Sequence, residues 1–275
     1  MSTAATTRDY YDALTGRLLR DYVHGNPRTE AAIGMVVQRI PASAKCVLDI
    51  GCGIGWSSAE IKGHLSDAVV FGVDLSPKLI ETATRLFGVT GLQFAVKDIT
   101  NVSSLCPDTM DAVVLVDCYE HIPKPDRAHV HRLLNQILSP HGTILLTFPS
   151  HLHQAHLRAN APDRLQPVDE DVALDDILRL AHDLRGEIVH YQHVNIWNTN
   201  DYVHAVIQRE PTFIPHNHPA ACPSCAVTLE PTAQRRQRVV AQLSVQVSED
   251  GVVTPAQQRS KRLLRTFLSR ARTQV

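Results

Sequence analysis

The sequence predicts an α/β fold in which helices cover both faces of a mostly parallel β-sheet. Strand-like and helix-like segments alternate between residues 45 and 184, which is the pattern of a parallel sheet with helical crossovers. The first strand runs directly into a turn that carries glycines at positions 51, 53 and 55. Two final strand-like runs are separated only by the short link 198–200, which predicts an antiparallel hairpin at the end of the sheet.

Each element follows from a local pattern in the chain. The strand-like runs are short and apolar, and they cover residues 45–50, 69–74, 92–96, 110–117, 143–148, 187–197 and 201–208. The expected helices cover residues 57–61, 78–87, 126–138 and 171–184. Ser76 and Pro77 supply an N-cap and a first-turn proline for the second of these helices. The strand at 110–117 is apolar throughout its centre, so we expect it to be buried on both faces.

Composition argues against several classes of protein. The formal net charge of −1 disfavours a polyanionic partner such as nucleic acid. No apolar run approaches the roughly 20 residues of a membrane-spanning helix, and residues 1–8 lack the apolar segment of a signal peptide. We therefore expect a cytoplasmic protein without membrane contact. Its six cysteines are expected to be free thiols, or a metal or redox pair, rather than a disulfide framework.

The glycine turn and the next strand predict a pocket for a nucleoside cofactor. Asp49 ends the apolar part of the first strand, and Gly51, Gly53 and Gly55 let the main chain turn sharply and approach a ligand closely. Asp74 ends the second strand, where a carboxylate accepts both hydroxyl hydrogens of a ribose. A dinucleotide fingerprint has the spacing G-x-G-x-x-G, but the turn here has the spacing G-x-G-x-G and no phosphate-binding Lys or Arg.

The acidic D-x-G-x-G-x-G turn resembles the first motif of the class I S-adenosylmethionine (SAM) dependent methyltransferases, and the resemblance covers about residues 45–209. It implies a Rossmann-like, mostly parallel seven-stranded sheet closed by an antiparallel C-terminal hairpin, with SAM as cofactor. The positions that the resemblance assigns to SAM are Asp49, Gly51, Gly53, Asp74, Leu75, Asp98, Ile99 and Asp117. Of these, Asp98 is also explained as a helix or turn cap, and Asp117 as a capping carboxylate.

The segment after the fourth strand carries the candidate catalytic residues. Tyr119, Glu120 and His121 resemble a stretch found in many small-molecule methyltransferases, and His121 is a candidate base for a hydroxyl acceptor. The alternative is that Glu120 and His121 only brace the following loop. Asp117, Glu120 and His121 also resemble a divalent-cation site of related enzymes, but Asp117 replaces the usual glutamate, so we expect no metal.

The resemblance also divides the chain into three expected parts: an N-terminal helical lid at 1–44, a SAM-binding core at 45–209 and an extension at 210–275. In the lid, Tyr10 and Tyr11 cover the cofactor or pack as an ordinary first helix. Histidines at 151, 153 and 156 either overhang the acceptor pocket or lie in an exposed loop.

In the extension, the potential ligands His216, His218, Cys222 and Cys225 have a spacing that supports zinc poorly, so a proline-rich loop is the favoured interpretation. The basic residues from Arg235 onward are expected to belong to a packed terminal helix.

These observations predict an enzyme that transfers a methyl group from SAM to a small molecule, most plausibly at oxygen and in specialised metabolism. The main alternative is a carbon methyltransferase acting on an isoprenoid or enol, in which Tyr10, Tyr11, Tyr119 and Glu120 stabilise a carbocation or enolate. A non-catalytic SAM-binding protein is the second alternative. A nucleic-acid methyltransferase is disfavoured because the core is not basic and residues 117–120 do not form an N-P-P-Y tetrad. A homodimer is compatible with the sequence.

Overall fold

The computed structural model describes residues 3–104, 109–211, 230–248 and 251–253. Its helices are α1 (Thr3–Ala13), α2 (Thr15–His24), α3 (Pro27–Arg39), α4 (Trp56–His64), α5 (Pro77–Phe87), α6 (Lys124–Ile137), α7 (His151–Asn160), α8 (Leu174–Asp183) and α9 (Thr232–Leu243). Its strands are β1 (Cys46–Ile50), β2 (Val69–Asp74), β3 (Leu92–Val96), β4 (Met110–Val116), β5 (Leu138–Pro149), β6 (Gly186–Val194), β7 (Tyr202–Arg209), β8 (Gln246–Ser248) and β9 (Gly251–Val253). Short 3₁₀ helices are η1 (Ile99–Ser104), η2 (Tyr119–His121) and η3 (Pro162–Arg164).

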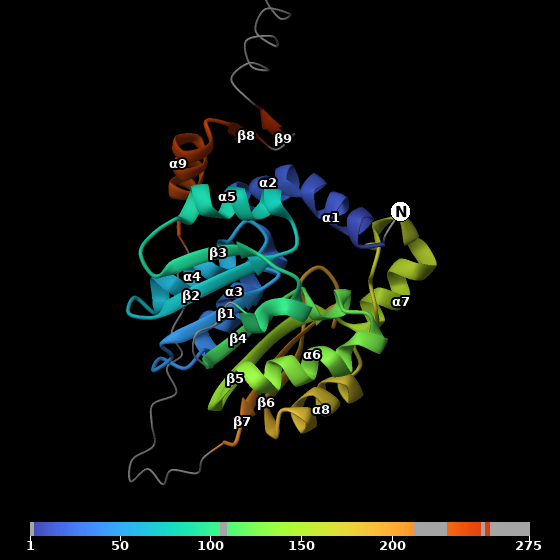
Figure 1. Ribbon diagram of the computed structural model, residues 1–275. Helices are drawn as coiled ribbons and strands as arrows, with labels where there is room; N and C mark the ends of the chain where they lie inside the picture. The colour runs from blue at the N-terminus through green and yellow to red at the C-terminus, as the bar shows by residue number, and fades with distance from the viewer. Residues whose placement is uncertain (1–2, 105–108, 212–229, 249–250, 254–275) are drawn as a thin grey trace, which may run out of the picture.

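Seven of these strands form one sheet in the order β3-β2-β1-β4-β5-β7-β6 (Figure 1). The pairs among β1 to β5 are parallel, whereas β7 is antiparallel to both of its neighbours, β5 and β6. The expected mostly parallel sheet with an antiparallel hairpin at its C-terminal end is therefore confirmed. This strand order places the adjacent C-terminal ends of β1, β2 and β4 along one edge, where open α/β sheets bind their ligands.

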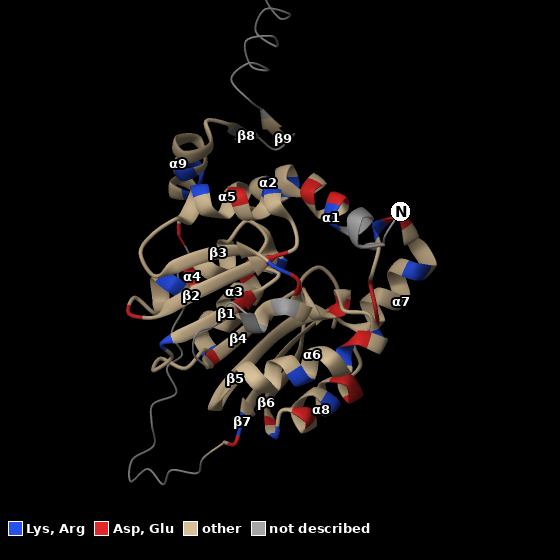
Figure 2. Ribbon diagram, in the orientation of Figure 1, with Lys and Arg blue, Asp and Glu red and all other residues tan. Residues whose placement is uncertain are grey.

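Two apolar clusters cover the two faces of the sheet. Successive residues of a strand point to opposite faces, and in β1 Val47 belongs to one cluster while Leu48 belongs to the other. The first cluster joins the sheet to α2, α3, α4, α5 and α9, and the second joins it to α6 and α8. Figure 1 shows α6 and α8 next to each other on their side of the sheet. Figure 2 shows Lys, Arg, Asp and Glu mainly on helices and loops, as expected for a buried sheet.

Local signals placed the starts of the four expected helices, now α4, α5, α6 and α8, within three residues. Ser76 accepts a hydrogen bond from the Leu79 N–H (3.0 Å) as the N-cap of α5, and Pro77 is the first helical residue. The end of α6 differs from the expectation, because the chain passes directly from α6 into β5 at Leu138 and makes a longer strand than residues 143–148. Residues 139–142 are Ser, Pro, His and Gly, which are typical of a turn, so the sequence hides the early start of β5.

The N-terminal and C-terminal segments pack against each other. Helices α1, α2 and α3 precede the sheet, and α9 contacts α2 and α5 while the small β8–β9 hairpin contacts α2 (Figure 1). Arg235, in the basic segment that was expected to pack, is buried in α9. The possible zinc ligands at 216, 218, 222 and 225 and the part of the basic segment after residue 253 lie outside the described residues. Within the described ranges, no helix combines the length and apolar character needed to cross a bilayer.

Candidate active site

Three cavities adjoin the C-terminal ends of β1, β2 and β4. A glycine-turn cavity of about 140 Å³ lies between the turn and the lid helices, and a strand-end cavity of about 140 Å³ lies beside Leu75 and Ile99. An outer cavity of about 440 Å³ extends from α2 to α7. His121 lines all three cavities, and Asp74 and Asp117 line the first two. The three cavities therefore adjoin one another around His121.

The glycine turn has the backbone that close approach to a ligand requires. Gly51, Gly53 and Gly55 have φ values of +73°, +56° and +85°, which side chains disfavour. A Cβ at Gly51 would lie 2.8 Å from Cys118 Sγ. The Gly51 N–H donates to the Val73 carbonyl (2.8 Å), which ties the turn to the end of β2. The positive φ at Gly51 and the crowding beside it make glycine necessary there.

Asp74 connects the turn to α5. One carboxylate oxygen accepts the Gly53 N–H (3.0 Å), and the other accepts the Ser76 N–H (2.9 Å). Burial raises the pKa of Asp74, although these backbone hydrogen bonds oppose the effect. Because a carboxylate oxygen accepts more than one hydrogen bond, each oxygen keeps capacity for a ligand hydroxyl.

Asp49 lies below the turn and lines none of the three cavities. It is fully buried, and one oxygen accepts the hydroxyl hydrogens of Ser57 and Ser58 at 2.6 Å each. Burial raises its pKa to about 6, against the effect of the two serines. These hydrogen bonds fix the first turn of α4 against β1, so Asp49 supports the glycine turn from behind.

The predicted adenine-side residues separate into two groups. Leu75 and Ile99 line the strand-end cavity, where they offer apolar surface. Asp98 is exposed and lines none of the cavities. One of its oxygens accepts both the N–H and the hydroxyl of Thr100 at 2.9 Å, which is the capping role that the sequence left open. Its other carboxylate oxygen keeps its capacity for an adenine edge.

Asp117 holds an unusual backbone conformation beside Arg28. Its φ is +48°, a value that costs free energy for a non-glycine residue and is common at functional sites. The Thr147 hydroxyl donates to one carboxylate oxygen (3.1 Å), and Arg28 Nη1 lies 3.0 Å from the other. The Arg28 guanidinium thus occupies the position of a cation beside Asp117. In the part of the chain that the structure describes, no group of three metal-type ligands is found.

His121 is oriented by the backbone. Its Nδ1 lies 2.7 Å from the Val168 carbonyl, which only accepts hydrogen bonds, so Nδ1 carries the hydrogen. In the neutral ring Nε2 therefore has the free lone pair. Burial lowers the pKa of His121, and this effect outweighs the carbonyl of Val168 and the nearby carboxylates. The ring is thus neutral and ready to accept a proton at Nε2.

Glu120 lies next to His121 and is almost fully buried. Its side chain is 1% exposed, and burial followed by the charge of Asp117 raises its pKa well above the ordinary range. Its Oε1 is 3.8 Å from His121 Nε2, and its Oε2 has no hydrogen-bond partner among the described residues. Glu120 lines the outer cavity. Its carboxyl group is therefore available to a ligand in that cavity.

Tyr119 lies elsewhere, so the structure does not support the expected catalytic position. It is fully buried between the sheet and α6, its hydroxyl is 2.8 Å from His131 Nε2, and it lines none of the cavities. The physical reason is η2, because successive residues of a 3₁₀ helix point about 120° apart. The turn directs Tyr119 into the core and the two following side chains toward the cavities.

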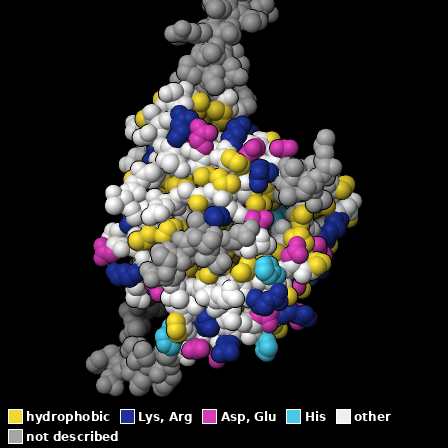
Figure 3. Space-filling view, viewed as in Figure 1, with side chains coloured by type: hydrophobic (Ala, Val, Ile, Leu, Met, Phe, Trp, Pro, Cys, Tyr) yellow, Lys and Arg dark blue, Asp and Glu magenta, His cyan; other side chains and the backbone are white. Residues whose placement is uncertain are grey.

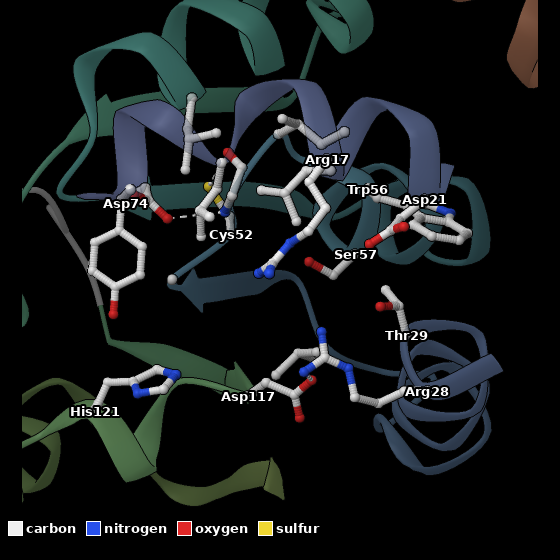
Figure 4. Close-up of a pocket in the computed structure, with 18 of the residues that line it drawn as sticks. Arg17, Asp21, Arg28, Thr29, Cys52, Trp56, Ser57, Asp74, Asp117 and His121 are labelled. Atoms are coloured by element: carbon white, nitrogen blue, oxygen red, sulfur yellow. Dashed lines mark hydrogen bonds and ion pairs between the residues drawn. The ribbon is translucent and has the colours of Figure 1, made fainter. Parts of the chain in front are cut away.

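Figure 4 shows His121, Asp117 and Arg28 on one side of the glycine-turn cavity, opposite Asp74, Cys52 and Arg17. Arg17 and Arg28 were not among the residues predicted for the site. A signal for Arg28 was present, because Asn26 and Pro27 form an N-cap and a first helical residue, which fixes Arg28 in the first turn of α3. No local pattern identifies Arg17.

The lid and the segment after β5 also contribute to the site. Tyr11 lines the glycine-turn and strand-end cavities, and Tyr10 lines the outer cavity. Of the three histidines after β5, His153 lines the outer cavity, whereas His151 and His156 line none. The lid interpretation of the N-terminal aromatic residues is therefore supported by their positions.

Comparisons with known proteins agree with this geometry. Residues 47–142 match the model of a family described as a methyltransferase domain. A carboxy-S-adenosyl-L-methionine synthase of Pasteurella multocida (strain Pm70) is 23% identical over 205 residues, or 66% of this chain and 83% of that protein. A ubiquinone biosynthesis O-methyltransferase of Xylella fastidiosa (strain 9a5c) is 31% identical over 115 residues, which cover 41% of this chain and 45% of that enzyme.

Solved structures share the fold. A magnesium protoporphyrin IX methyltransferase from Synechocystis PCC 6803, with bound SAH, has a TM-score of 0.57 and 18% identity; the match covers 74% of this chain and 99% of that chain. The complex of the Haloferax volcanii Trm112 methyltransferase activator with a putative methyltransferase gives a TM-score of 0.59 and 17% identity. This match covers 76% of this chain and 100% of that chain. The fold thus agrees with that of these methyltransferase structures.

Proposed function

We propose that this chain is a class I SAM-dependent methyltransferase that uses SAM as its cofactor and methylates an oxygen atom of a small molecule. The observation that carries the choice of oxygen is the His121 tautomer. A hydroxyl acceptor needs a base, and His121 offers an unprotonated Nε2 toward cavities that adjoin the glycine turn.

The residues present fit SAM. Asp74 has unused acceptor capacity for two ribose hydroxyls, and Leu75 and Ile99 offer apolar surface to an adenine. The main chain at Gly51 and Gly53 is open to the methionine part of the cofactor. Asp49 acts indirectly in this arrangement, by fixing the turn, and Asp117 lies between the cofactor cavities and the acceptor. Most of the proposed cofactor residues line the first two cavities, whereas Asp49 and Asp98 line neither.

The proposed reaction needs little beyond positioning and proton removal. SAM supplies an electrophilic methyl group on a sulfonium that is a good leaving group. As the acceptor oxygen bonds to this methyl carbon, the carbon–sulfur bond breaks and its electron pair remains on sulfur. His121 Nε2 takes the hydroxyl proton, while the Val168 carbonyl holds the ring in place. Glu120 lies beside His121 and contacts the acceptor in the outer cavity.

Carbon methylation remains the alternative proposal. Of its four stabilising residues, Tyr10 and Glu120 line the outer cavity and Tyr11 lines the other two, but Tyr119 lines none. Oxygen is further supported by relatives named as O-methyltransferases of ubiquinone biosynthesis and of malonyl-[acyl-carrier protein]. These considerations favour oxygen over carbon.

The proposal is tested with SAM labelled with ¹³C at the methyl group. A small-molecule extract of the source organism is incubated with the protein, and ¹³C NMR of the products distinguishes an O–CH₃ from a C–CH₃. We expect an O–CH₃ product, and we expect His121→Ala to lower kcat about 100-fold while SAM affinity holds. The control is His141→Ala, because His141 is exposed and far from the cavities. A C–CH₃ product, or a His121→Ala enzyme with near-normal kcat, would overturn the proposal.

A further inference from the structure

The outer cavity has an unusual concentration of arginines. Its volume is about 440 Å³, three times that of either neighbouring cavity, and it is enclosed by lid helices on one side and by α7 and η3 on the other. Four arginines line it: Arg17 and Arg20 from α2, Arg28 from α3 and Arg164 from η3. Arg17 and Arg20 are three residues apart and thus lie on the same face of α2.

Three of these arginines have no carboxylate partner. Arg28 is paired with Asp117, but no ion pair or hydrogen bond to a carboxylate is formed by Arg17, Arg20 or Arg164 within the described ranges. An arginine remains charged at any physiological pH and offers a planar set of donors that matches carboxylate and phosphate groups. The three side chains are thus available to an anionic ligand.

The acidic residues of the cavity do not balance these charges. Asp169 accepts the Gln154 side-chain amide (2.6 Å) and the Gln166 N–H (3.1 Å), so both of its oxygens are engaged. Burial pushes Glu120 toward its neutral form. The donors to Asp169 are neutral and leave its charge in place, so the cavity has two charged carboxylates, Asp21 and Asp169, and three unpaired arginines. The cavity therefore has a surplus of positive charge.

The deep end of the cavity offers a second kind of contact. Gln154 is 1% exposed, and because the Asp169 carboxylate only accepts hydrogen bonds, the Gln154 amide nitrogen faces it. This leaves Gln154 Oε1 without a hydrogen-bond partner among the described residues, and Glu120 Oε2 also has none there. Buried acceptors without donors cost free energy. Both atoms belong to residues that line the cavity beside His121, so the single hydrogen of a ligand hydroxyl there can be accepted by one of these atoms or by His121 Nε2.

We infer that the methyl acceptor is a hydroxylated acid, whose carboxylate or phosphate binds Arg17, Arg20 and Arg164 and whose hydroxyl lies near Gln154, Glu120 and His121. This inference rests on the proposed function, because it specifies the acceptor of that reaction. The arginines hold the anionic end at the lid side and the buried acceptors hold the hydroxyl end beside Nε2 of His121. An amine acceptor would place its positive charge among the arginines, which is unfavourable.

A nucleic acid does not fit the same features. Its phosphates need a basic surface, whereas these arginines surround one cavity. On the face of the molecule that Figure 3 displays, basic and acidic side chains are interspersed. The anionic group is therefore that of a small molecule.

Calorimetry of the full chain with S-adenosylhomocysteine present tests the inference. The probes are citrate, tricarballylate (which is citrate without its hydroxyl) and inorganic phosphate. We expect citrate to bind, tricarballylate to bind more weakly, and Arg20→Gln and Arg164→Gln each to weaken citrate about tenfold, since a charge-assisted hydrogen bond is worth about 1.5–3 kcal/mol. Arg132→Gln, an exposed arginine on α6, is the matched control. Tighter binding of phosphate than of citrate would identify the anionic group as a phosphate, and tighter binding of citrate would identify it as a carboxylate.

The inference is overturned if neither citrate nor phosphate binds, if both arginine variants bind citrate as the wild type does, or if tricarballylate equals citrate. These measurements involve no methyl transfer, so they do not depend on the proposed reaction. Citrate binding without any methylated product would contradict the proposed function alone. Conversely, methylation of an acceptor that an anion-exchange resin does not retain at pH 7 would contradict this inference alone.

Discussion

His121 has a neutral carbonyl oxygen as its Nδ1 partner, and this partner influences the pKa of the ring. A carboxylate hydrogen-bonded to Nδ1 would raise the pKa of the ring strongly. The Val168 carbonyl also raises this pKa, but burial lowers it by more. Asp169 lies farther away, at 4.0 Å from Nδ1. The ring consequently loses its proton below the ordinary histidine pKa of about 6.5.

This direction predicts the pH dependence of methyl transfer. The base is active when neutral, so kcat should rise with pH through a midpoint below about 6.5 and stay constant above it. The measurement is kcat against pH for the wild type and two variants. His121→Ala should lose the ascending limb, whereas His153→Gln, which changes another histidine of the outer cavity, should retain it. A limb that persists in His121→Ala, or a wild-type midpoint above 7, would show that another group is the base.

Helix α9 packs against the outer side of the lid. Arg235 is 4% exposed, lies 4.9 Å from the ring centre of Trp56 and 5.7 Å from that of Tyr22, and pairs with Glu30 at 3.1 Å. Trp56 begins α4 and lines the glycine-turn cavity. A single side chain of the C-terminal extension thus connects α2, α3 and α4 beside the cofactor cavities.

Removal of this side chain should destabilise the fold measurably. A desolvated cation–π contact is worth about 2 kcal/mol, so Arg235→Ala should lower the free energy of unfolding by about that amount or more. Urea denaturation followed by circular dichroism measures the difference. Arg236→Ala changes the adjacent, exposed arginine of the same helix and should have little effect. Equal stability of the two variants would mean that α9 does not brace the lid.

The sequence was sufficient to predict the sheet but not the packing of the segments that close the site. Each strand and the glycine turn have local signals, and the antiparallel β7 followed from the short link before it. Contacts between distant segments have no such signal: Arg235 and Glu30 are 205 residues apart. Side-chain direction was also hidden for Tyr119, because a three-residue turn determines it and has no periodic pattern.

Helix α1, the glycine turn and the ends of β2 and β4 all contribute residues to the cofactor cavities. Asp12 of α1 accepts a hydrogen bond from the Ser76 hydroxyl, next to the segment that carries Asp74. The lid is therefore attached two residues from Asp74, the residue proposed to bind the ribose. Removal of the Asp74 carboxylate should weaken cofactor binding more than removal of any single lid contact, because both of its oxygens are available to the ribose hydroxyls.

Calorimetric titration of SAM into the wild type and Asp74→Ala tests whether the glycine-turn cavity binds SAM through Asp74. We predict at least tenfold weaker SAM binding by the variant, since each charge-assisted hydrogen bond lost is worth about 1.5–3 kcal/mol. The unfolding midpoint is measured in parallel because Asp74 also accepts two backbone N–H groups. Asp67→Ala, an exposed aspartate just before β2, should bind SAM as the wild type does. Unchanged SAM affinity in a folded Asp74→Ala protein, or tight binding of NAD by the wild type, would contradict this account.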